Sequence, residues 1–519
     1  MAVVAGGRYH RSVRSILALA LLGTLAALPG RTLASPPQSL AATAAPAMPA
    51  EALHRLADRL RRLDEDGLDP SDYRIPPDSL AERDPAAWQA GLMRAAVLAL
   101  TDLLHGKVRE LPRRADLRRD IAALPLGPWL AELSTAADPA AVISRAALLP
   151  PDAAALKAAL ATARARVAAG GFPAVPGNPN ETLEPGSVDP VRVPALRARL
   201  AVSDPAVAAA RRDDPVYDEA LVSAVRRFQA EQGLEMDGRV GRQTLAALNR
   251  PAEAIVQQLR VALDMRRAAA PEPQERHIEV NIPHQRLQVI ERGRVRLEMA
   301  VIVGKPARAT PTLRVRLSAV QFNPPWGVPE RNAREDLLPR FRRDPRAMME
   351  KGFRVYSIVE GQRVEIDPTT IDWSSVSRQR FPYIIRQDAG DNNALGRIKF
   401  VIPNSEDIFM HDTPDRHLFR RPDRAFSSGC IRLEKPMELL DIALEGVPGW
   451  DRARVSRILD SRATVATSIP RSIPVRLHYT TVVVEGGQVR LRPDIYGLDE
   501  AYARALDAPR AQQAAAGAH

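Results

Sequence analysis

Cysteine is almost absent from this chain of 519 residues, since Cys430 is the only one. A single cysteine excludes an internal disulfide framework. Histidine, cysteine and acidic residues do not gather at metal-ligand spacings, and His277 and His284 flank a strand-like run without such a spacing. The sequence therefore predicts no metal and no cofactor. It leaves the lone thiol as either a buried small hydrophobe or a reactive group.

Long apolar runs are also scarce, and the one that stands out lies near the N-terminus. Arg8, Arg11 and Arg14 precede an apolar run at 16–28, and small residues follow. This is the pattern of a secretory signal peptide at residues 1–34, with cleavage after Ala34. The run is too short to span a bilayer comfortably. We expect a periplasmic protein that meets the membrane transiently through its signal peptide; an uncleaved anchor at the outer face is the alternative.

Blocks of Lys and Arg with interleaved aromatic residues are missing, although the formal net charge is +11. Such blocks mark nucleic-acid grooves, so we expect no nucleic-acid partner. A basic protein is still attracted to acidic polymers. The simpler source of the charge is a composition rich in Ala, Arg and Pro throughout.

Helical periodicity dominates the first part of the chain. Leu53, Leu56, Leu60 and Leu63 recur at helical steps. The sequence thus predicts a helical scaffold domain at 35–185, with further helices at 93–104 and 153–169. Residues 172–194 are rich in Pro, Gly and Asn, which indicates a linker or an irregular arm.

A second helical unit is predicted at 190–250. Its pattern resembles the peptidoglycan-binding module, a small three-helix domain, and a plain helical hairpin is the alternative. The resemblance rests on Phe228-Gln229, Gly233-Leu234, Asp237-Gly238, Gly241, Thr244 and Leu248-Asn249.

From residue 277 apolar residues alternate with polar ones, as strands require. The sequence predicts a mainly-β domain at 275–465, either a sandwich or a barrel. A helical, charged insertion at 330–380 interrupts it, as a lid or binding loop would. A strand and tail region follows at 466–519. The expected class is a multidomain α+β chain.

The chemistry is expected between residues 400 and 434. His411 is followed by a polar, basic stretch and then by the run Ser427-Ser428-Gly429-Cys430-Ile431-Arg432. A thiol with a pKa of about 8.5 is mostly protonated at neutral pH, and an imidazole that takes the proton makes it a strong nucleophile. Attack on an amide creates an oxyanion, which the backbone amides of Ser428, Gly429 and Cys430 are placed to hold.

Other side chains are candidates for binding or orientation. Arg432 shares a strand face with Cys430, so its guanidinium suits a substrate carboxylate; a surface arginine is the alternative. Asp412 is expected to orient His411 through its backbone carbonyl. Trp326 and Tyr383 either line an acceptor cleft or pack in the core. His417 is expected at the surface.

These residues resemble the YkuD-type L,D-transpeptidase catalytic domain, in the large multidomain periplasmic branch of that family. The family motif is a His, a spacer, Ser/Thr-His-Gly-Cys, a hydrophobic residue, and Asn or Arg. The chain departs from it at Ser428, where most members have His. It matches at His411, Ser427, Gly429, Cys430, Ile431 and Arg432, and further matches lie at 323–329, 386–396 and 494–497.

The resemblance implies a peptidoglycan L,D-transpeptidase with His411 as general base and Cys430 as nucleophile. The donor would be a tetrapeptide stem that loses its terminal D-alanine and becomes a thioester on Cys430. An amine of another stem would then form a 3→3 crosslink. Ser427, Arg432, Trp326 and Tyr383 would bind substrate. The implied partners are peptidoglycan stem peptides and glycan and other cell-wall synthesis enzymes, and carbapenems are implied inhibitors.

Two other functions fit the same residues. Water as the acceptor would make the protein an L,D-carboxypeptidase that uses the same nucleophile. A non-catalytic wall-binding scaffold would act through residues 195–250 and would not need Cys430. The pairing of His411 with Cys430 argues against the second alternative.

Overall fold

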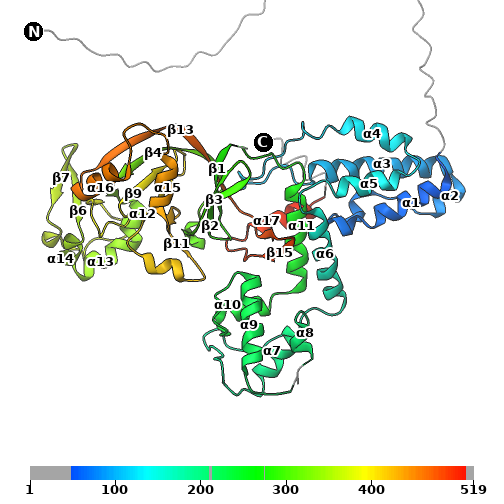
Figure 1. Ribbon diagram of the computed structural model, residues 1–519, viewed down its shortest axis with the longest axis horizontal. Coiled ribbons are helices and arrows are strands. Elements are labelled where there is room, and N and C mark those ends of the chain that lie inside the picture. The colour runs from blue at the N-terminus through cyan, green and yellow to red at the C-terminus, as the bar shows by residue number, and fades with distance from the viewer. Residues whose placement is uncertain (1–47, 210–212, 274, 510–519) are drawn as a thin grey trace, which may run out of the picture. The chain divides into compact units, whose positions relative to one another are not determined.

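The computed structural model describes residues 48–209, 213–273 and 275–509. The predicted signal peptide at 1–34 lies outside these ranges. Helices dominate up to residue 266 and strands dominate from residue 276 (Figure 1). The change of sequence periodicity therefore predicted the α+β class correctly.

The N-terminal helices pack around a core of Leu and Ala side chains. The longest, α3, begins where the Asp84 carboxylate accepts a hydrogen bond from the Ala87 amide (2.9 Å), and it ends at Gly106, whose φ of +79° is unfavourable for other residues. The elements are α1 (Ala50–Arg61), η1 (Leu63–Asp66), η2 (Pro70–Tyr73), α2 (Ser79–Arg83), α3 (Pro85–His105), α4 (Leu126–Thr135), α5 (Pro139–Ala147) and α6 (Ala153–Ala168).

A second helical core explains the Phe-Gln and Asp-Gly pairs of the sequence. Gln229 is buried, and its side-chain amide donates to Asp237 (2.8 Å) and accepts from the Gly238 amide (2.9 Å). A buried amide needs such partners, so this residue fixes the turn after its helix. The helices are α7 (Arg192–Leu200), α8 (Pro205–Ala208), α9 (Glu219–Gln232) and α10 (Arg242–Leu248).

Residues 172–191 form an irregular arm rather than a free linker, and the last residues of the predicted stretch, 192–194, begin α7. Val175 and Leu183 are buried in the core of α7, α9 and α10. Leu183 also forms an isolated β-bridge with Val240. The Pro- and Gly-rich composition excluded regular structure here but did not exclude packing.

Helix α11 (Ala252–Arg266) contacts α6 and the C-terminal helix α17 (Leu498–Asp507). Asp264 of α11 is fully buried, accepts hydrogen bonds from the Tyr502 hydroxyl (2.7 Å) and the Lys107 amide (2.7 Å), and pairs with Arg119 (3.0 Å). A buried carboxylate requires this degree of pairing. The Asp264 carboxylate therefore holds together three segments that are far apart in the sequence.

The region from residue 276 onward is built on a nine-stranded sheet with the order β11-β3-β12-β10-β9-β4-β13-β1-β2. A further pairing joins the last strand of this order, β2, to β3, the second strand, so the strands from β3 to β2 close on themselves as in a barrel and β11 pairs with β3 outside that closure. The strands are β1 (Arg276–Asn281), β2 (Arg286–Glu291), β3 (Arg294–Gly304), β4 (Leu313–Phe322), β9 (Ile398–Val401), β10 (Met410–His411), β11 (Ala425–Ser427), β12 (Ile431–Leu433) and β13 (Val465–His478). Helices α15 (Pro436–Ala443) and α16 (Arg452–Ser461) follow β12.

The expected boundary at residue 465 needs correction. Strand β13 begins there and pairs with β4 on one side and β1 on the other, so it belongs to the centre of the sheet. Within the described residues, the hairpin β14 (Val482–Glu485) and β15 (Gln488–Leu491) and the helix α17 follow β13. The region at 466–509 is therefore structural and is not a tail.

The insertion at 330–380 is only half helical, which corrects the prediction of a helical cap. Its second half joins a four-stranded sheet, because Phe353 and Val355 alternate with polar residues and enter a separate core with Phe341 and Trp373. The sheet order is β5-β8-β6-β7. The elements are β5 (Trp326–Gly327), α12 (Glu330–Asn332), η4 (Ala333–Leu337), α13 (Leu338–Arg343), α14 (Pro345–Glu350), β6 (Phe353–Val359), β7 (Gln362–Ile366) and β8 (Ile384–Gln387).

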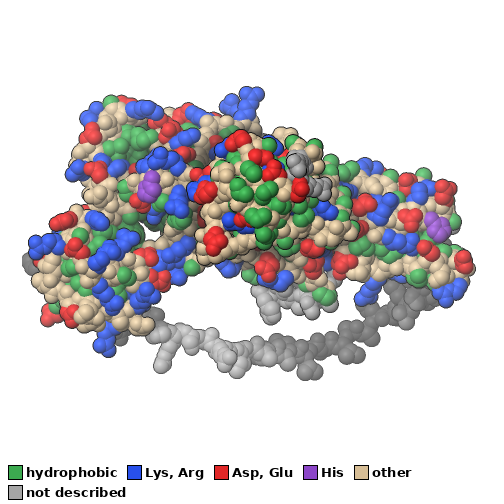
Figure 2. Space-filling model, turned by 90° about the horizontal axis from the view of Figure 1, so that it is seen from below, with side chains coloured by type: hydrophobic (Ala, Val, Ile, Leu, Met, Phe, Trp, Pro, Cys, Tyr) green, Lys and Arg blue, Asp and Glu red, His purple; other side chains and the backbone are tan. Residues whose placement is uncertain are grey.

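Charged side chains are mixed on the face shown in Figure 2, where Lys and Arg alternate with Asp and Glu. On that face the basic excess does not form one continuous patch. Among the described residues, no helix is both long and apolar enough to cross a membrane.

Candidate active site

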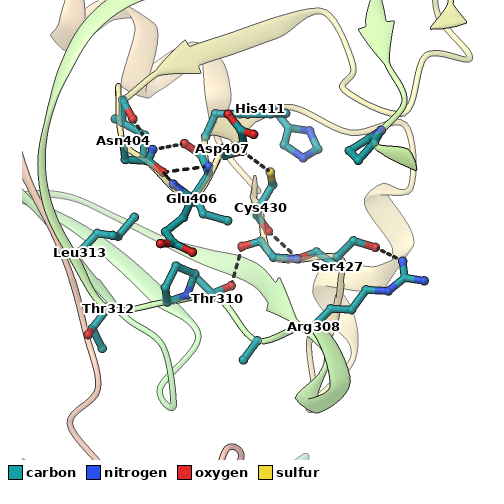
Figure 3. Close-up of a pocket in the computed structure, with 18 of the residues that line it drawn as sticks. Arg308, Thr310, Thr312, Leu313, Asn404, Glu406, Asp407, His411, Ser427 and Cys430 are labelled. Atoms are coloured by element: carbon teal, nitrogen blue, oxygen red, sulfur yellow. Dashed lines mark hydrogen bonds between the residues drawn. The ribbon is translucent and has the colours of Figure 1, made fainter. Parts of the chain in front are cut away.

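Three neighbouring strands place a thiol and an imidazole on one face of the sheet. In the register, His411 of β10 lies opposite Arg432 of the parallel strand β12 and opposite Lys399 of the antiparallel strand β9. Met410 and Ile431, one position earlier, are buried in the barrel core. Because residues two apart share a face, Cys430 lies diagonally next to His411, and Figure 3 shows both side chains at the same cavity.

This cavity is a cleft of about 1490 Å³. One wall comes from the N-terminal region, through the segment 110–117, and Thr312 is tied to that segment by a hydrogen bond to the Arg113 carbonyl (3.2 Å). The cleft is lined by most of the residues predicted for the site, namely Trp326, His411, Ser427, Ser428, Gly429, Cys430 and Arg432.

Tyr383 does not line the cleft, which corrects its assignment to substrate binding. Its ring packs against Trp373 (centroids 5.5 Å apart) and Phe381 (6.0 Å) in the core of the insertion. The alternative of core packing therefore holds for Tyr383, whereas Trp326 reaches the cleft. His417 is exposed, as expected.

His411 is held in one tautomer by its own strand. Its Nδ1 lies 2.6 Å from the backbone carbonyl of Asp412, as expected from the sequence. A carbonyl oxygen only accepts, so Nδ1 carries the proton and Nε2 presents a lone pair. Burial, followed by the positive charge of Arg432, lowers the pKa of His411 from 6.5 to about 3. The imidazole is therefore neutral at physiological pH and able to accept a proton.

Cys430 is partly exposed to the cleft, and its Sγ lies 3.9 Å from the Asp407 carbonyl. Burial is the largest cause that raises the pKa of the thiol from 9.0 to about 11. The resting site thus holds a neutral thiol beside a neutral imidazole. The chemistry that this pair supports is proton transfer during attack on a substrate, rather than a preformed ion pair.

The loop before the nucleophile is fixed by its own side chains. Ser427 Oγ accepts a hydrogen bond from the Gly429 amide (3.1 Å) and donates to the Cys430 carbonyl (2.5 Å). Gly429 has a φ of +119°, which a side chain would strain. The Gly429 amide, one of three predicted oxyanion donors, is therefore already used by Ser427.

The direction of the Cys430 amide is set by a hydrogen bond to the carbonyl of the same peptide unit, that of Gly429. Thr310 Oγ1 donates to the Gly429 carbonyl (2.7 Å). In a planar trans peptide the C=O and the following N–H point in opposite directions, so the Cys430 N–H points away from Thr310. Within the described ranges, the amides of Ser428 and Cys430 donate to no protein acceptor. These two amides remain available for an oxyanion.

Two cations flank the imidazole along the row across the strands. Arg432 forms an ion pair with Asp415 (3.0 Å). The Lys399 ammonium lies 3.9 Å from the centre of the Phe409 ring. The sequence analysis did not single out Lys399. The alternation in β9 places its side chain on the other face of the strand from the buried Ile398 and Phe400. The described residues contain no cluster of His, Cys, Asp and Glu that could hold a metal ion.

Comparisons with known proteins agree with this architecture. Residues 275–454 match the family model of the "L,D-transpeptidase catalytic domain", YkuD. Residues 192–248 match the "Putative peptidoglycan binding domain", and residues 44–160 match the "Scaffold domain".

A curated relative from Haemophilus influenzae, the "Putative L,D-transpeptidase", is 45% identical over 222 residues, which are 43% of this chain and 44% of that protein. This chain thus spans less than half of the length of that relative. Solved structures with similarity include the L,D-transpeptidase from Mycobacterium smegmatis (14% identity, TM-score 0.19, 39% of this chain and 58% of that chain). The L,D-transpeptidase (residues 123-326) from Xylanimonas cellulosilytica has 17% identity and a TM-score of 0.19, and the match covers 58% of this chain and 99% of that chain.

The motif, the geometry of the cleft and the family match concern the same residues. In chain order, this chain therefore carries regions similar to a scaffold domain (44–160), a peptidoglycan-binding domain (192–248) and an L,D-transpeptidase catalytic domain of the YkuD family (275–454), and the last of these contains the cleft with His411 and Cys430.

Proposed function

We propose that this protein is a periplasmic peptidoglycan L,D-transpeptidase that forms 3→3 crosslinks through a thioester on Cys430. The observation that carries the proposal is the position of a neutral, tautomer-fixed His411 beside the thiol in a cleft large enough for peptide stems. The peptidoglycan-binding domain supports peptidoglycan as the substrate.

In the first half-reaction, Cys430 Sγ attacks the carbonyl carbon between the third and fourth residues of a tetrapeptide stem. His411 Nε2 takes the thiol proton as the C–S bond forms. The negative oxygen lies against the amides of Cys430 and Ser428. The C–N bond then breaks, His411 returns the proton to the leaving nitrogen, and D-alanine departs.

In the second half-reaction, a side-chain amine of another stem attacks the thioester carbonyl. His411 accepts a proton from this amine, the C–S bond breaks, and the same proton restores the thiol. The acyl group is thereby transferred and an amide bond forms. Arg432 and Lys399 supply positive charge for stem carboxylates, and Arg432 retains free donors while it is paired with Asp415.

The half-reactions are tested with a defined tetrapeptide donor, with and without an acceptor stem. The expected result is an acyl-enzyme that mass spectrometry finds on the peptide containing Cys430, a crosslinked product when acceptor is present, and neither with Cys430→Ala. A tripeptide as the main product in the presence of acceptor would instead assign an L,D-carboxypeptidase. Full crosslinking by Cys430→Ala would contradict the proposal.

A further inference from the structure

Each of the three residues before Cys430 accepts a hydrogen bond from one short segment of the barrel, residues 304–310. This segment includes the end of β3 and the turn η3 (Pro306–Arg308). The contacts are from the Lys305 amide to the Ser427 carbonyl (3.0 Å), from Arg308 Nη1 to Ser428 Oγ (2.7 Å), and from Thr310 Oγ1 to the Gly429 carbonyl (2.7 Å).

The middle contact also reaches the insertion. The Arg308 side chain is only 4% exposed, and its guanidinium donates to Asp336 (2.5 Å) and Glu335 (2.5 Å) at the start of the insertion. Hydrogen bonds from Arg308 and Arg331 lower the pKa of Glu335 to about 2, so it stays ionised. One buried cation therefore joins the loop before Cys430 to the insertion. Figure 3 shows the Arg308 side chain reaching this loop.

A second bond from the insertion meets the same atom. Asn332 Nδ2 donates to Ser428 Oγ (3.0 Å). A hydroxyl oxygen has two lone pairs, so Ser428 can accept from Arg308 and Asn332 together. This gives the serine, at a position where the family motif usually has histidine, a physical role of its own.

We propose that Arg308 and Asn332 are positioning residues that act through Ser428 to set the backbone amides used as oxyanion donors. The inference rests on the proposed acyl transfer. Lys305 and Thr310 hold the peptides before Ser428 and after Gly429 from the barrel, and the Ser428 hydroxyl adds a restraint from the insertion next to Gly429, whose φ is +119°. With the Ser428 hydroxyl held from the insertion, the Ser428 and Cys430 amides keep one orientation, so the oxyanion site depends on where the insertion lies.

The test is Ser428→Ala, with Asn332→Ala as a milder variant and Ser357→Ala in β6 of the insertion as the matched control. These variants leave the Arg308 ion pairs with Glu335 and Asp336 in place. We expect the rate of Cys430 acylation by a tetrapeptide donor to fall about 10- to 100-fold in Ser428→Ala, through kcat rather than KM. Ser428→Thr, which keeps the hydroxyl, should recover most of the rate.

The rate of thiol alkylation by iodoacetamide distinguishes the positioning role from a general loss of structure, which would change that rate. Alkylation forms no oxyanion, so its rate should be unchanged in Ser428→Ala. Hydrogen exchange of the peptide covering 427–430 should become faster in Ser428→Ala than in the wild type and in Ser357→Ala.

The outcomes separate the two proposals. Absence of acylation in the wild type would overturn the proposed function, while faster exchange in Ser428→Ala would still support the positioning role. Unchanged acylation and exchange in Ser428→Ala, or a parallel loss of acylation and alkylation, would overturn the positioning role alone.

Discussion

Two histidines of the barrel are both buried but have different neighbours. His411 ends β10 and is 4% exposed, His478 ends β13 and is 8% exposed, and burial is the largest cause that lowers the pKa of each. His478 Nδ1 is satisfied by the Thr480 hydroxyl (2.9 Å), and its other neighbours are charged. His411 instead faces a cleft with a thiol. A lowered pKa therefore does not identify the base; the neighbouring group does.

The largest expected effect comes from replacing each histidine in turn. His411→Asn should lower the rate of Cys430 acylation by about 10³-fold, because His411 is the only histidine among the described residues that line the cleft. His478→Asn should leave that rate nearly unchanged and destabilise the fold by about 1–3 kcal/mol, since it disturbs a buried polar contact. Intact-protein mass spectrometry and urea unfolding measure the two effects. Equal losses of acylation would remove the distinction between the histidines.

The pH dependence of acylation sharpens the comparison. With a pKa of about 3 for His411 and about 11 for Cys430, the base is unprotonated and the thiol protonated across the neutral range. The donor half-reaction should therefore have nearly constant kcat/KM from about pH 5 to about pH 9. An acidic limb with an apparent pKa near 6.5 would show that His411 is far less shielded from water than its burial implies.

A smaller effect is expected from two threonines whose hydroxyls donate to different carbonyls; the Thr310 hydroxyl also accepts a hydrogen bond from the Gly304 amide (2.9 Å). The Thr310 hydroxyl bonds the Gly429 carbonyl beside the nucleophile, whereas that of Thr312 bonds the Arg113 carbonyl (3.2 Å). Thr310→Val should slow acylation about tenfold by releasing the peptide that carries the Cys430 amide. Thr312→Val is the control of the same shape, and a similar loss in both variants would contradict this assignment.

The smallest effect concerns stability in acid. Because the pKa of His478 lies below 6.5 in the folded state, only the unfolded state binds a proton just below that pH. This histidine therefore lowers the free energy of unfolding as pH falls from 6.5, by at most about 1.4 kcal/mol per pH unit. His478→Asn lacks this term, so the stability difference between wild type and variant should shrink between pH 7 and pH 5 in urea titrations. A constant difference would mean that His478 binds a proton in the folded state as readily as in the unfolded state.

The sequence predicted the strand pattern and most of the cleft because both depend on local order. Alternation placed Ile278 and Val280 in the core, and the two-residue spacing placed Arg432 on the side of Cys430. It did not predict the row that contains Lys399, because the pairing of β9 with β10 depends on register between separate strands. Nor did it predict that Tyr383 would pack beside Trp373, since an aromatic residue in an irregular segment carries no periodic signal.

The sequence did not predict the structural roles of β13 and α17, for a related reason. Both are local elements with recognisable patterns, but their partners β1, β4 and α11 lie some 150 to 240 residues earlier in the chain. A boundary drawn where motifs end therefore cut through the centre of a sheet. The sequence of the insertion predicts helix because its first half is helical, whereas its strands are recognisable only from their pairing, which is mainly with one another.

The order of residues alone indicated the candidate thiol, the imidazole that we propose as its base, and the glycine beside the thiol, because these are matters of residue type and short spacing. Tertiary structure alone decided which cations flank His411, which amides are open to an oxyanion, and that Arg308 joins the insertion to Ser428. The physical reason is that hydrogen bonds and buried charges take their strength from partners that only folding brings within reach.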